Sequence, residues 1–411
     1  MRNFHGMLIA ASAFAAMGGP AAAKQDEPLA CSVNAPNVSC VMKDLDNPRG
    51  LAFGPHGTLF VAEAGTGNAP CRPGTGFNCY GHTGAITRLW RGEQIRVASG
   101  FASLSFVLGA SARGPHDIVM WRDKGGQPSM PGGEGAIVSL GLEMTATARN
   151  AAGRGDLGRL AHIPIDTLLA PSSQLCPDCW SAVVDIASSL GSNQESDPYG
   201  MIVDKGHGTD DDSIALIDSS RNALLRVDAQ GAVSSMAAFP SRVDGRSTDS
   251  VPTTVVRGPD GDYYVGEFVG IPFQNTTTAT RQPANIYRVS ADPLHDVTVF
   301  LGGFNAIIDM AFHGENLYVL QHWSSFVSSN LKDGKLIRIA CHDRPLVCDG
   351  PPEVILDGLD VPTSVLIGRG AIYISHHGAT PAFLSQTGPR QRLGEVLRLA
   401  LDDDDGEEEE D

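Results

Sequence analysis

The chain has little positive charge and, after its first 23 residues, no long apolar segment. Lys and Arg number 30 against 47 Asp and Glu, which gives a formal net charge of −17. This balance excludes a basic surface for a phosphate backbone, so we expect no nucleic-acid partner. No stretch of the mature chain is apolar enough to span a bilayer. The sequence also lacks a G-x-S-x-G elbow, an H-E-x-x-H motif and a Walker loop, which excludes the commonest catalytic signatures.

The two ends of the chain differ from the rest in composition. Residues 1–23 combine a positive start at Arg2, a short apolar core and small residues at Ala21–Ala23, which is typical of a secretory signal. Residues 402–411 carry nine acidic side chains and predict a disordered, solvated tail. We therefore expect one folded domain over 24–401 in a secreted or periplasmic protein.

Eight cysteines occur as close pairs, which suits an oxidising compartment. We predict four local disulfides, namely Cys31–Cys40, Cys71–Cys79, Cys176–Cys179 and Cys341–Cys348. The C-x-x-C spacing of Cys176 and Cys179 leaves a redox or a metal site as alternatives there. Trp180 follows this pair in place of the His of a haem attachment site.

Six copies of one pattern run along the chain, each built from three or four short apolar runs and Gly-rich turns. They begin at Asn47–Phe53, Gly114–Met120, Asp197–Val203, Val251–Arg257, Ala306–Phe312 and Val361–Ile367. The aligned residues Pro198, Pro252, Ile307 and Pro362 are 54, 55 and 55 residues apart. Repeated groups of short strands at a near-constant period predict an all-β fold, a six-bladed β-propeller.

The sixth copy contains only three runs, and the missing run is found near the N-terminus. Val38–Gly50 matches Pro351–Ser364, the segment that leads into the sixth copy. We therefore predict that an N-terminal strand completes the last blade and closes the ring, which leaves no open sheet edge at the seam.

Polar residues recur at two aligned positions that lie on the face carrying the longer loops. The second run of five copies ends at Glu63, Asp218, Glu267, Gln321 and His376. The first runs begin with chemically varied residues, among them Arg49, His116, Asp117, Tyr199 and Asp309. Long loops on a rigid scaffold favour a functional site, so we expect one at the mouth of the central channel.

These positions supply our candidate site residues. We assign a candidate metal ion to Glu63, Glu267, Asp309 and His376, and a ligand to Arg49, Asp117, Tyr199, Gln321 and His322. His116 is the candidate general base. Carboxylates favour calcium and imidazoles favour a transition metal, so the set does not choose an ion. The structural alternative is that the acids pair with Arg49 or cap loop amides.

The segments LDNPRGLAFGPHGTLFVAEAGTG, CYGHTGAITRL and GPHDIVM resemble the ScyD/ScyE family of exported proteins. The resemblance implies a six-bladed propeller related to NHL and TolB-like repeats and implies no established activity. The first segment is also similar to calcium-dependent lactonases of the gluconolactonase type. That likeness implies carboxylate roles for Glu63 and Asp309 and an amide role for Gln321. A third likeness, to soluble quinoprotein sugar dehydrogenases, implies a His base and basic residues around a quinone, for which His116 and Arg49 are candidates.

Three functions follow as expectations. The first is a binding or scaffold propeller that holds a small molecule or a protein partner on its long-loop face. The second is a metal-dependent hydrolase of a small lactone or ester, with calcium as the candidate ion. The third is a quinoprotein sugar dehydrogenase.

Overall fold

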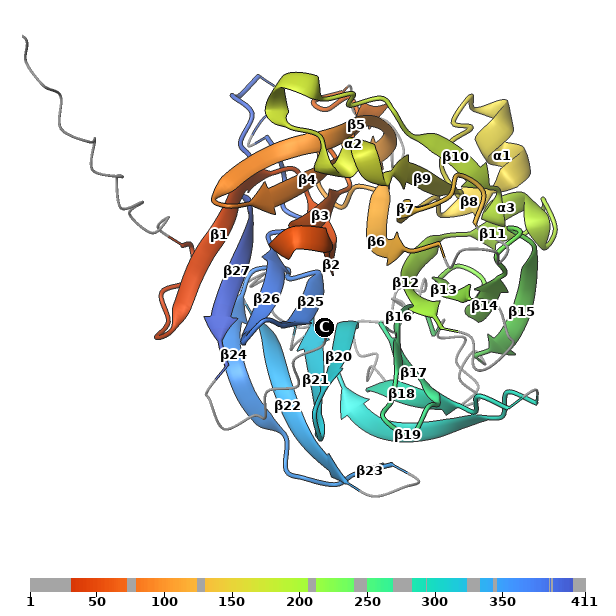
Figure 1. Ribbon diagram of the computed structural model, residues 1–411, viewed down its shortest axis with the longest axis vertical. Helices are drawn as coiled ribbons and strands as arrows, with labels where there is room; N and C mark the ends of the chain where they lie inside the picture. Colours follow the sequence, from red (N-terminus) through yellow and green to blue (C-terminus); the bar gives the residue numbers. More distant parts are fainter. Residues whose placement is uncertain are drawn as a thin grey trace, which may run out of the picture.

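A computed structural model shows a six-bladed β-propeller, with small antiparallel sheets arranged in a ring (Figure 1). It describes residues 31–71, 79–123, 130–205, 212–239, 250–268, 283–292, 294–323, 333–342, 346–383, 385 and 387–401. The segments expected as signal peptide and acidic tail lie outside these ranges.

Each blade is an antiparallel sheet whose strands follow one another from the axis outward. Blade 1 consists of β2 (Pro48–Phe53), β3 (Leu59–Glu63), β4 (Cys79–Trp90) and β5 (Glu93–Ser105). Blade 2 consists of β6 (Pro115–Trp121), β7 (Gly135–Leu140), β9 (Leu160–Pro164) and β10 (Ser181–Val184). Blade 3 consists of β12 (Pro198–Asp204), β13 (Ser213–Asp218), β14 (Ala223–Val227) and β15 (Val233–Ala238).

The second half of the ring repeats the plan. Blade 4 consists of β16 (Pro252–Arg257), β17 (Tyr263–Glu267), β18 (Ala284–Val289) and β19 (Val297–Phe304). Blade 5 consists of β20 (Ile307–His313), β21 (Asn316–Gln321), β22 (Gly334–His342) and β24 (Glu353–Leu359), and β23 (Val347–Cys348) pairs with the end of β22. Blade 6 consists of β25 (Ser364–Gly368), β26 (Ala371–His376), β27 (Gly394–Ala400) and the N-terminal β1 (Val38–Leu45).

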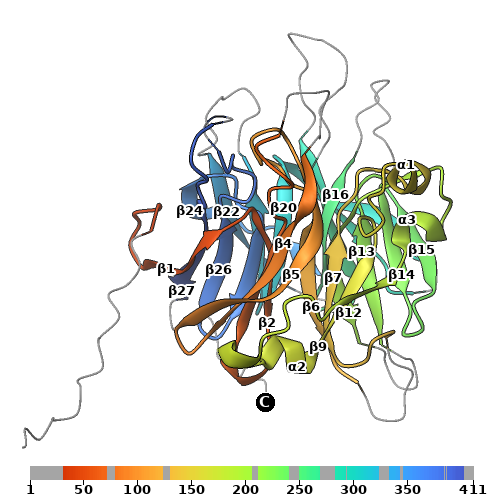
Figure 2. The ribbon, with the colours of Figure 1, turned by 90° about the horizontal axis from the view of Figure 1, so that it is seen from above.

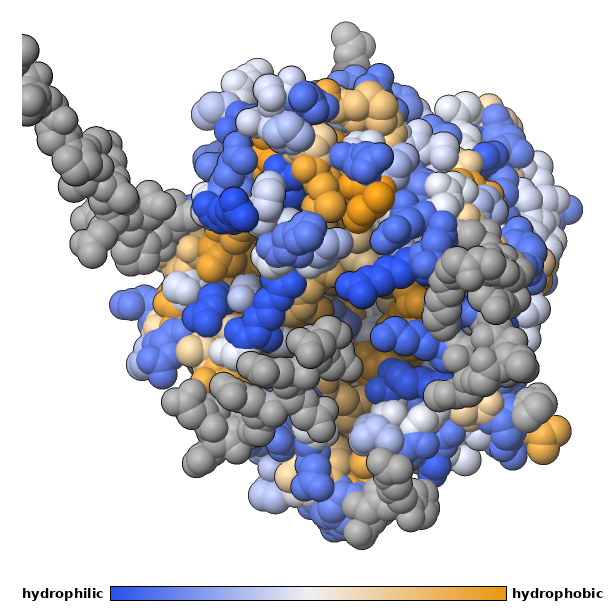
Figure 3. Space-filling model, viewed as in Figure 1, coloured by the Kyte–Doolittle hydropathy of each residue, from blue (hydrophilic) through white to orange (hydrophobic). Residues whose placement is uncertain are grey.

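The remaining elements are short and decorate the first two blades. They are η1 (Pro55–Gly57), β8 (Met144–Thr145), α1 (Ala146–Ala151), α2 (Ile165–Leu169), η2 (Ser172–Gln174), α3 (Ile186–Ser189) and β11 (Glu195–Ser196). Seen edge-on, η1 and α2 lie on one face of the ring (Figure 2). The space-filling view shows that face, where hydrophilic side chains cover much of the rim (Figure 3). Because β2 ends just before η1, its first residues lie on the opposite face.

Burial explains why the second strand of each blade reads as a continuous apolar run. Every residue of β3, β7, β13 and β17 is buried, because each of these strands is covered by a neighbouring blade on both sides. The outer strands β15 and β19 keep several exposed residues. Between blades 1 and 2, Phe60 and Phe101 pack in one apolar cluster with Ile118.

The predicted closure of the ring is confirmed. Strand β1 pairs antiparallel with β27, from Val38 opposite Leu399 to Leu45 opposite Gly394. Met42 and Leu45 are 0% and 1% exposed and pack in a cluster with Val61 of blade 1. The N-terminal strand therefore completes blade 6 and also fills the interface between the last blade and the first.

Three of the four expected disulfides are present: Cys71–Cys79, Cys176–Cys179 and Cys341–Cys348. Cys31 and Cys40 are thiols in this structure, but their side chains lie in hydrogen-bond contact, so the fourth disulfide stays a prediction. The Cys40 thiol also lies 3.4 Å from the Met42 carbonyl and 3.4 Å from Glu395 Oε2. Burial and the Glu395 charge raise the pKa of this thiol. Within the described residues no helix is long and apolar enough to cross a membrane.

Met42→Ala tests the closure. Removing this fully buried side chain should lower the free energy of unfolding by about 2–5 kcal/mol, because it leaves a cavity between blades 6 and 1. Lys43→Ala, one residue along the same strand and only half-buried, should change it by no more than about 1 kcal/mol, because no comparable cavity forms. Deleting residues 32–44 should lower the melting temperature much further. An unchanged melting temperature after that deletion would contradict a closing role for β1.

Candidate functional site

The carboxylate of Glu63 is a structural anchor. It is 0% exposed and accepts hydrogen bonds from the Asp46 backbone N–H (2.6 Å) and the Thr87 hydroxyl. Arg96 forms an ion pair with it, Nη2 to Oε2 at 2.5 Å, and also pairs with Asp46. These donors satisfy the buried charge and hold the turn that leads into β2.

The same cap recurs around the ring. Asp218 accepts the backbone N–H of Asp197 (2.8 Å), and Gln321 accepts that of Asn305 (2.7 Å). In blade 6, Nε2 of His376 accepts the backbone N–H of Asp360 (2.6 Å). In each case the side chain ending the second strand satisfies an amide just before the innermost strand of its own blade.

The predicted metal ligands Glu63, Glu267, Asp309 and His376 therefore lie in four different blades. Glu267 accepts from the Asn285 backbone N–H (2.9 Å) and the Tyr287 hydroxyl (3.0 Å). A calcium ion held by this set would have to replace these hydrogen bonds. These four side chains already serve as hydrogen-bond partners within the protein. They therefore do not form the calcium site that the lactonase resemblance implies.

Asp117 and Asp309 tie neighbouring blades together near the axis. Asp117 Oδ2 accepts a hydrogen bond from the backbone N–H of Met201 in blade 3, at 2.8 Å. Asp309 Oδ2 accepts one from the backbone N–H of Val365 in blade 6, at 2.9 Å. A Cβ on Gly50 would lie 2.0 Å from Asp117 Oδ1, so blade 1 requires glycine beside this carboxylate. Burial and the negative charge of Asp309 raise the pKa of Asp117 to about 8.

Arg49 lies at the start of β2, beside the channel axis, and its charge acts on several of the predicted ligand residues. Its guanidinium is buried, and Nη2 donates to the Ala112 carbonyl at 3.0 Å. Burial lowers the pKa of His116 in blade 2 and of His322 in blade 5, and the Arg49 charge lowers both further. Burial raises the pKa of Tyr199, and the Arg49 charge partly offsets this rise. Residues from four blades thus share one electrostatic environment.

The two histidines of this environment differ in their hydrogen bonding. His116 Nδ1 lies 3.3 Å from the Pro198 carbonyl, its ring lies against Tyr199, and the Ala112 carbonyl is also close enough to raise its pKa. His322 donates from Nδ1 to the Pro362 carbonyl at 2.7 Å, which leaves Nε2 as an acceptor. Burial lowers the pKa of His322 to about 4, so the ring is neutral at pH 7. The geometry therefore favours His322 over the predicted His116 as a base.

Aromatic rings flank His322. Its ring centroid lies 4.6 Å from that of Trp323 and 5.6 Å from that of Phe268. Phe268 and Trp323 also meet each other edge to face at 5.1 Å. The sequence placed His322 at the end of a strand, but it carried no signal for this aromatic group because Phe268 belongs to a different blade.

A second polar cluster lies at the seam and was not predicted as a group. Ligand atoms of His376, His377 and Glu395 lie within 4.8 Å of one another. Ser32 Oγ donates to Glu395 and lies 3.2 Å from His376 Nδ1. Because His376 Nε2 accepts from the Asp360 amide, the ring proton is on Nδ1, which lies 3.1 Å from Glu395 Oε1. Burial would raise the pKa of Glu395, but hydrogen bonds from His376 and Ser32 lower it to about 2.

No protein-family model matches the chain, and no curated protein is significantly similar to it in sequence. Solved structures share its fold at low identity. An aldose sugar dehydrogenase from Streptomyces coelicolor, bound to PQQ, is 11% identical, with 88% of this chain and 96% of that chain covered and a TM-score of 0.49. A gluconolactonase from Xanthomonas campestris is 14% identical, with 71% and 98% covered and a TM-score of 0.36. Virginiamycin B lyase from Staphylococcus aureus is 11% identical, with 88% and 97% covered and a TM-score of 0.41. Such distant likeness concerns the propeller fold and not the chemistry.

The substitution Glu63→Gln tests whether the Glu63 carboxylate stabilises the fold or binds a metal ion. The variant leaves Arg96 with a weakened buried partner, so the free energy of unfolding should fall by about 3 kcal/mol. The metal content of the purified protein should not change. Glu93→Gln, an exposed position in the same blade, should alter neither quantity. A loss of bound metal without a loss of stability would restore the metal-ligand interpretation of Glu63.

Asp117→Asn tests the buried acid near the axis. The folded pKa of about 8 exceeds the ordinary value of 3.8, so the folded chain keeps a proton that the unfolded chain loses. Stability contributed by this group is therefore present at low pH and falls as the pH rises from about 4 to about 8. The variant should show a shallower fall in melting temperature across this interval, measured by calorimetry. Asp357→Asn, on the exposed edge of blade 5, should keep the wild-type slope.

Proposed function

We propose that the protein is an exported binding propeller that holds a small organic anion at the channel mouth, over Arg49. The observation that carries this proposal is the state of the Arg49 side chain. It is 7% exposed, and its Nε is buried without a hydrogen-bond partner among the described residues. A buried cation is stable only when its donors are satisfied, and a carboxylate accepts two parallel hydrogen bonds from a guanidinium.

The neighbours of Arg49 narrow the class of ligand. Tyr199 is half-buried, and burial raises its pKa, so its hydroxyl is a neutral donor. His322 Nε2 accepts a hydrogen bond from a ligand hydroxyl or amine. Phe268 and Trp323 beside it offer apolar ring surface. Together they suit an unsaturated or aromatic carboxylate that carries a hydroxyl or amino group.

A hydrolase of a small ester or lactone is the second candidate. The observation that favours it is the neutral ring of His322, whose Nε2 can take a proton from an attacking water while Arg49 holds the carbonyl oxygen. The quinoprotein dehydrogenase rests on sequence resemblance alone. We also propose that the protein is exported and belongs to the ScyD/ScyE family. The three disulfides support an oxidising compartment.

Arg49→Met tests the binding site. Carboxylates of the stated class would be screened for a rise in melting temperature, and each hit would be titrated by calorimetry. The variant should bind about 10–100-fold more weakly, because it loses charge-assisted hydrogen bonds and keeps a side chain of similar length. Arg91→Met, in the exposed turn between β4 and β5, should bind as the wild type does. Equal affinities for wild type and Arg49→Met would reject the site.

Incubating the protein with esters of the carboxylates found in the screen distinguishes a binding protein from a hydrolase. A pure binding protein releases each ester unchanged, and His322→Gln then alters affinity alone. Turnover that disappears in His322→Gln while binding persists would reassign the protein as a hydrolase.

A further inference from the structure

The segment that precedes β1 places one exposed hydroxyl against blade 6. Ser32 Oγ lies 3.1 Å from Nε2 of His377 and 3.2 Å from Nδ1 of His376. The hydroxyl of Ser32 donates to Glu395, and its backbone N–H donates to Oε1 of the same carboxylate at 3.2 Å. A serine hydroxyl within hydrogen-bond reach of an imidazole is the arrangement that nucleophilic catalysis requires.

His377 has a carboxylate on the other side of its ring. Its Nδ1 lies 3.3 Å from Asp360 Oδ2, and its backbone N–H donates to the Asp360 carbonyl at 3.0 Å. Asp360 is 9% exposed. Because a carboxylate only accepts, the ring proton belongs on Nδ1, and the lone pair of the neutral ring is on Nε2, toward Ser32. Ser32, His377 and Asp360 are therefore ordered as nucleophile, base and orienting acid.

The backbone of His377 has a conformation that residues other than glycine rarely adopt. Its φ is 60°, in the left-handed region, at the first residue after β26. Such backbone conformations are concentrated at functional sites, where they direct a side chain. Here the conformation accompanies the backbone hydrogen bond to Asp360, so it fixes the imidazole beside its carboxylate.

Two acceptors compete for the single hydroxyl proton of Ser32. One is Glu395. Burial opposes its ionisation, but hydrogen bonds from His376 and Ser32 lower its pKa to about 2, so this carboxylate is a weak base. The other acceptor is the imidazole of His377, and an imidazole is a stronger base than such a carboxylate. Glu395 therefore positions Ser32 at rest, and His377 takes the proton when the oxygen attacks.

His376 supplies a fixed donor beside the nucleophile. Its Nε2 accepts the Asp360 backbone N–H at 2.6 Å, so its ring proton is on Nδ1. Burial lowers the pKa of this ring, which keeps it neutral at pH 7. An N–H held in one orientation near the attacking oxygen stabilises negative charge that develops on a carbonyl oxygen.

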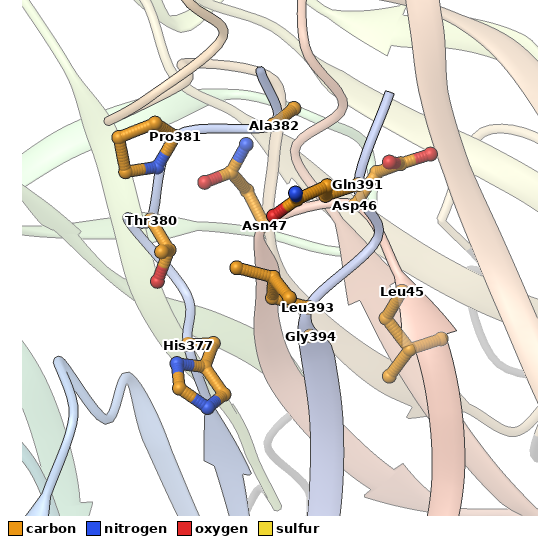
Figure 4. A pocket seen from close by; sticks show the side chains of 10 residues that line it. All are labelled: Leu45, Asp46, Asn47, His377, Thr380, Pro381, Ala382, Gln391, Leu393 and Gly394. Carbon is orange, nitrogen blue, oxygen red and sulfur yellow. The ribbon is translucent and has the colours of Figure 1, made fainter. Parts of the chain in front are cut away.

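A small pocket at the seam of the ring adjoins this group (Figure 4). It contains about 190 Å³ of empty space, and the ring of His377 lines it together with the apolar side chains of Leu45, Pro381 and Leu393. Pockets for drug-sized ligands measure about 300–1,000 Å³, so this one admits only a small group. Its lining acid, Asp46, is already paired with three arginines. The pocket therefore suits a short, uncharged acyl chain.

We propose that Ser32, His377 and Asp360 form a catalytic site at the seam, which hydrolyses small esters of short carboxylic acids through an acyl-serine. Ser32 Oγ bonds to the carbonyl carbon, and its proton passes to His377 Nε2. The ester C–O bond then breaks, and the alcohol leaves with that proton. Water attacks the acyl-serine, transfers a proton to His377 and releases the carboxylic acid, and Ser32 regains the proton.

This site is separate from the one proposed at the channel mouth and shares neither Arg49 nor His322 with it. Its nucleophile precedes β1, while its base and orienting acid belong to blade 6. Ser32 is held beside them only while β1 pairs with β27. Closure of the ring therefore assembles the site from both ends of the chain.

Covalent labelling of the mature protein with a fluorophosphonate probe tests the nucleophile. The serine oxygen bonds to phosphorus and fluoride leaves, and mass spectrometry of the digested protein locates the adduct, which we expect on Ser32. Ser32→Ala should abolish the label, whereas Ser234→Ala, at an exposed position of β15, should leave it unchanged. His377→Gln should slow labelling at least about 100-fold, because the general base is lost.

Turnover of p-nitrophenyl acetate and butyrate by the same proteins tests catalysis. Ser32→Ala should lose it. Asp360→Asn keeps the shape of the side chain but loses the charge that orients His377, so kcat should fall at least about 100-fold. KM should stay within about threefold, because Asp360 does not touch the ester. His322→Gln, at the channel mouth, should keep the wild-type rate.

Three results would overturn the proposal. The first is the absence of an adduct on Ser32. The second is equal labelling of the wild type and His377→Gln, which would make Ser32 an ordinary surface hydroxyl. The third is turnover that persists in Ser32→Ala and is lost in His322→Gln, which would place the reaction at the channel mouth.

Discussion

The pairing of β1 with β27 is the constraint on which the rest of the molecule depends. A ring of sheets has no edge only while its first and last blades are joined, and here the join is made by strands from opposite ends of the chain. The turn that follows β1 contains Asn47 and leads directly into Pro48 and Arg49 at the start of β2. Blade 6 holds this turn through the hydroxyl of Thr363, which donates to the Pro48 carbonyl, and that of Ser375, which donates to the Arg49 carbonyl (2.7 and 2.6 Å).

Each innermost strand poses the same problem, because the chain must turn sharply beside the axis in surroundings with little water. The backbone amides of these turns need acceptors, and the second strand supplies one at its last residue. Asp218, Gln321 and His376 differ in charge and shape yet serve the same purpose. A polar residue repeated at one level of a propeller is therefore explained by backbone satisfaction before it is explained by chemistry.

The fold could be predicted from the sequence because it depends on periodicity alone. The near-constant spacing of Pro198, Pro252, Ile307 and Pro362 specified the blades, and the three-run sixth copy specified the closure. The alignment also placed Arg49, Tyr199 and His322 near the channel mouth, and the Arg49 charge acts on the pKa of both other residues. Their roles could not be predicted. The preference for His322 over His116 depends on the additional Ala112 carbonyl beside His116, and the Cys40 thiol lies against Glu395, a residue 355 positions away.

The channel mouth and the seam of the ring are two electrostatic environments that lie beside the same short segment of chain, from Asp46 to Arg49. At the mouth, burial and the Arg49 charge keep His116 and His322 neutral, so positive charge is concentrated on the guanidinium and favours an anion. At the seam, the Asp46 carboxylate is paired with Arg96, Arg390 and Arg392, so its negative charge is already balanced within the protein. Asp46 and Arg49 are only three residues apart, and hydrogen bonds from Thr363 and Ser375 of blade 6 hold the backbone of this segment. An intact closure is therefore a precondition for binding at the channel mouth.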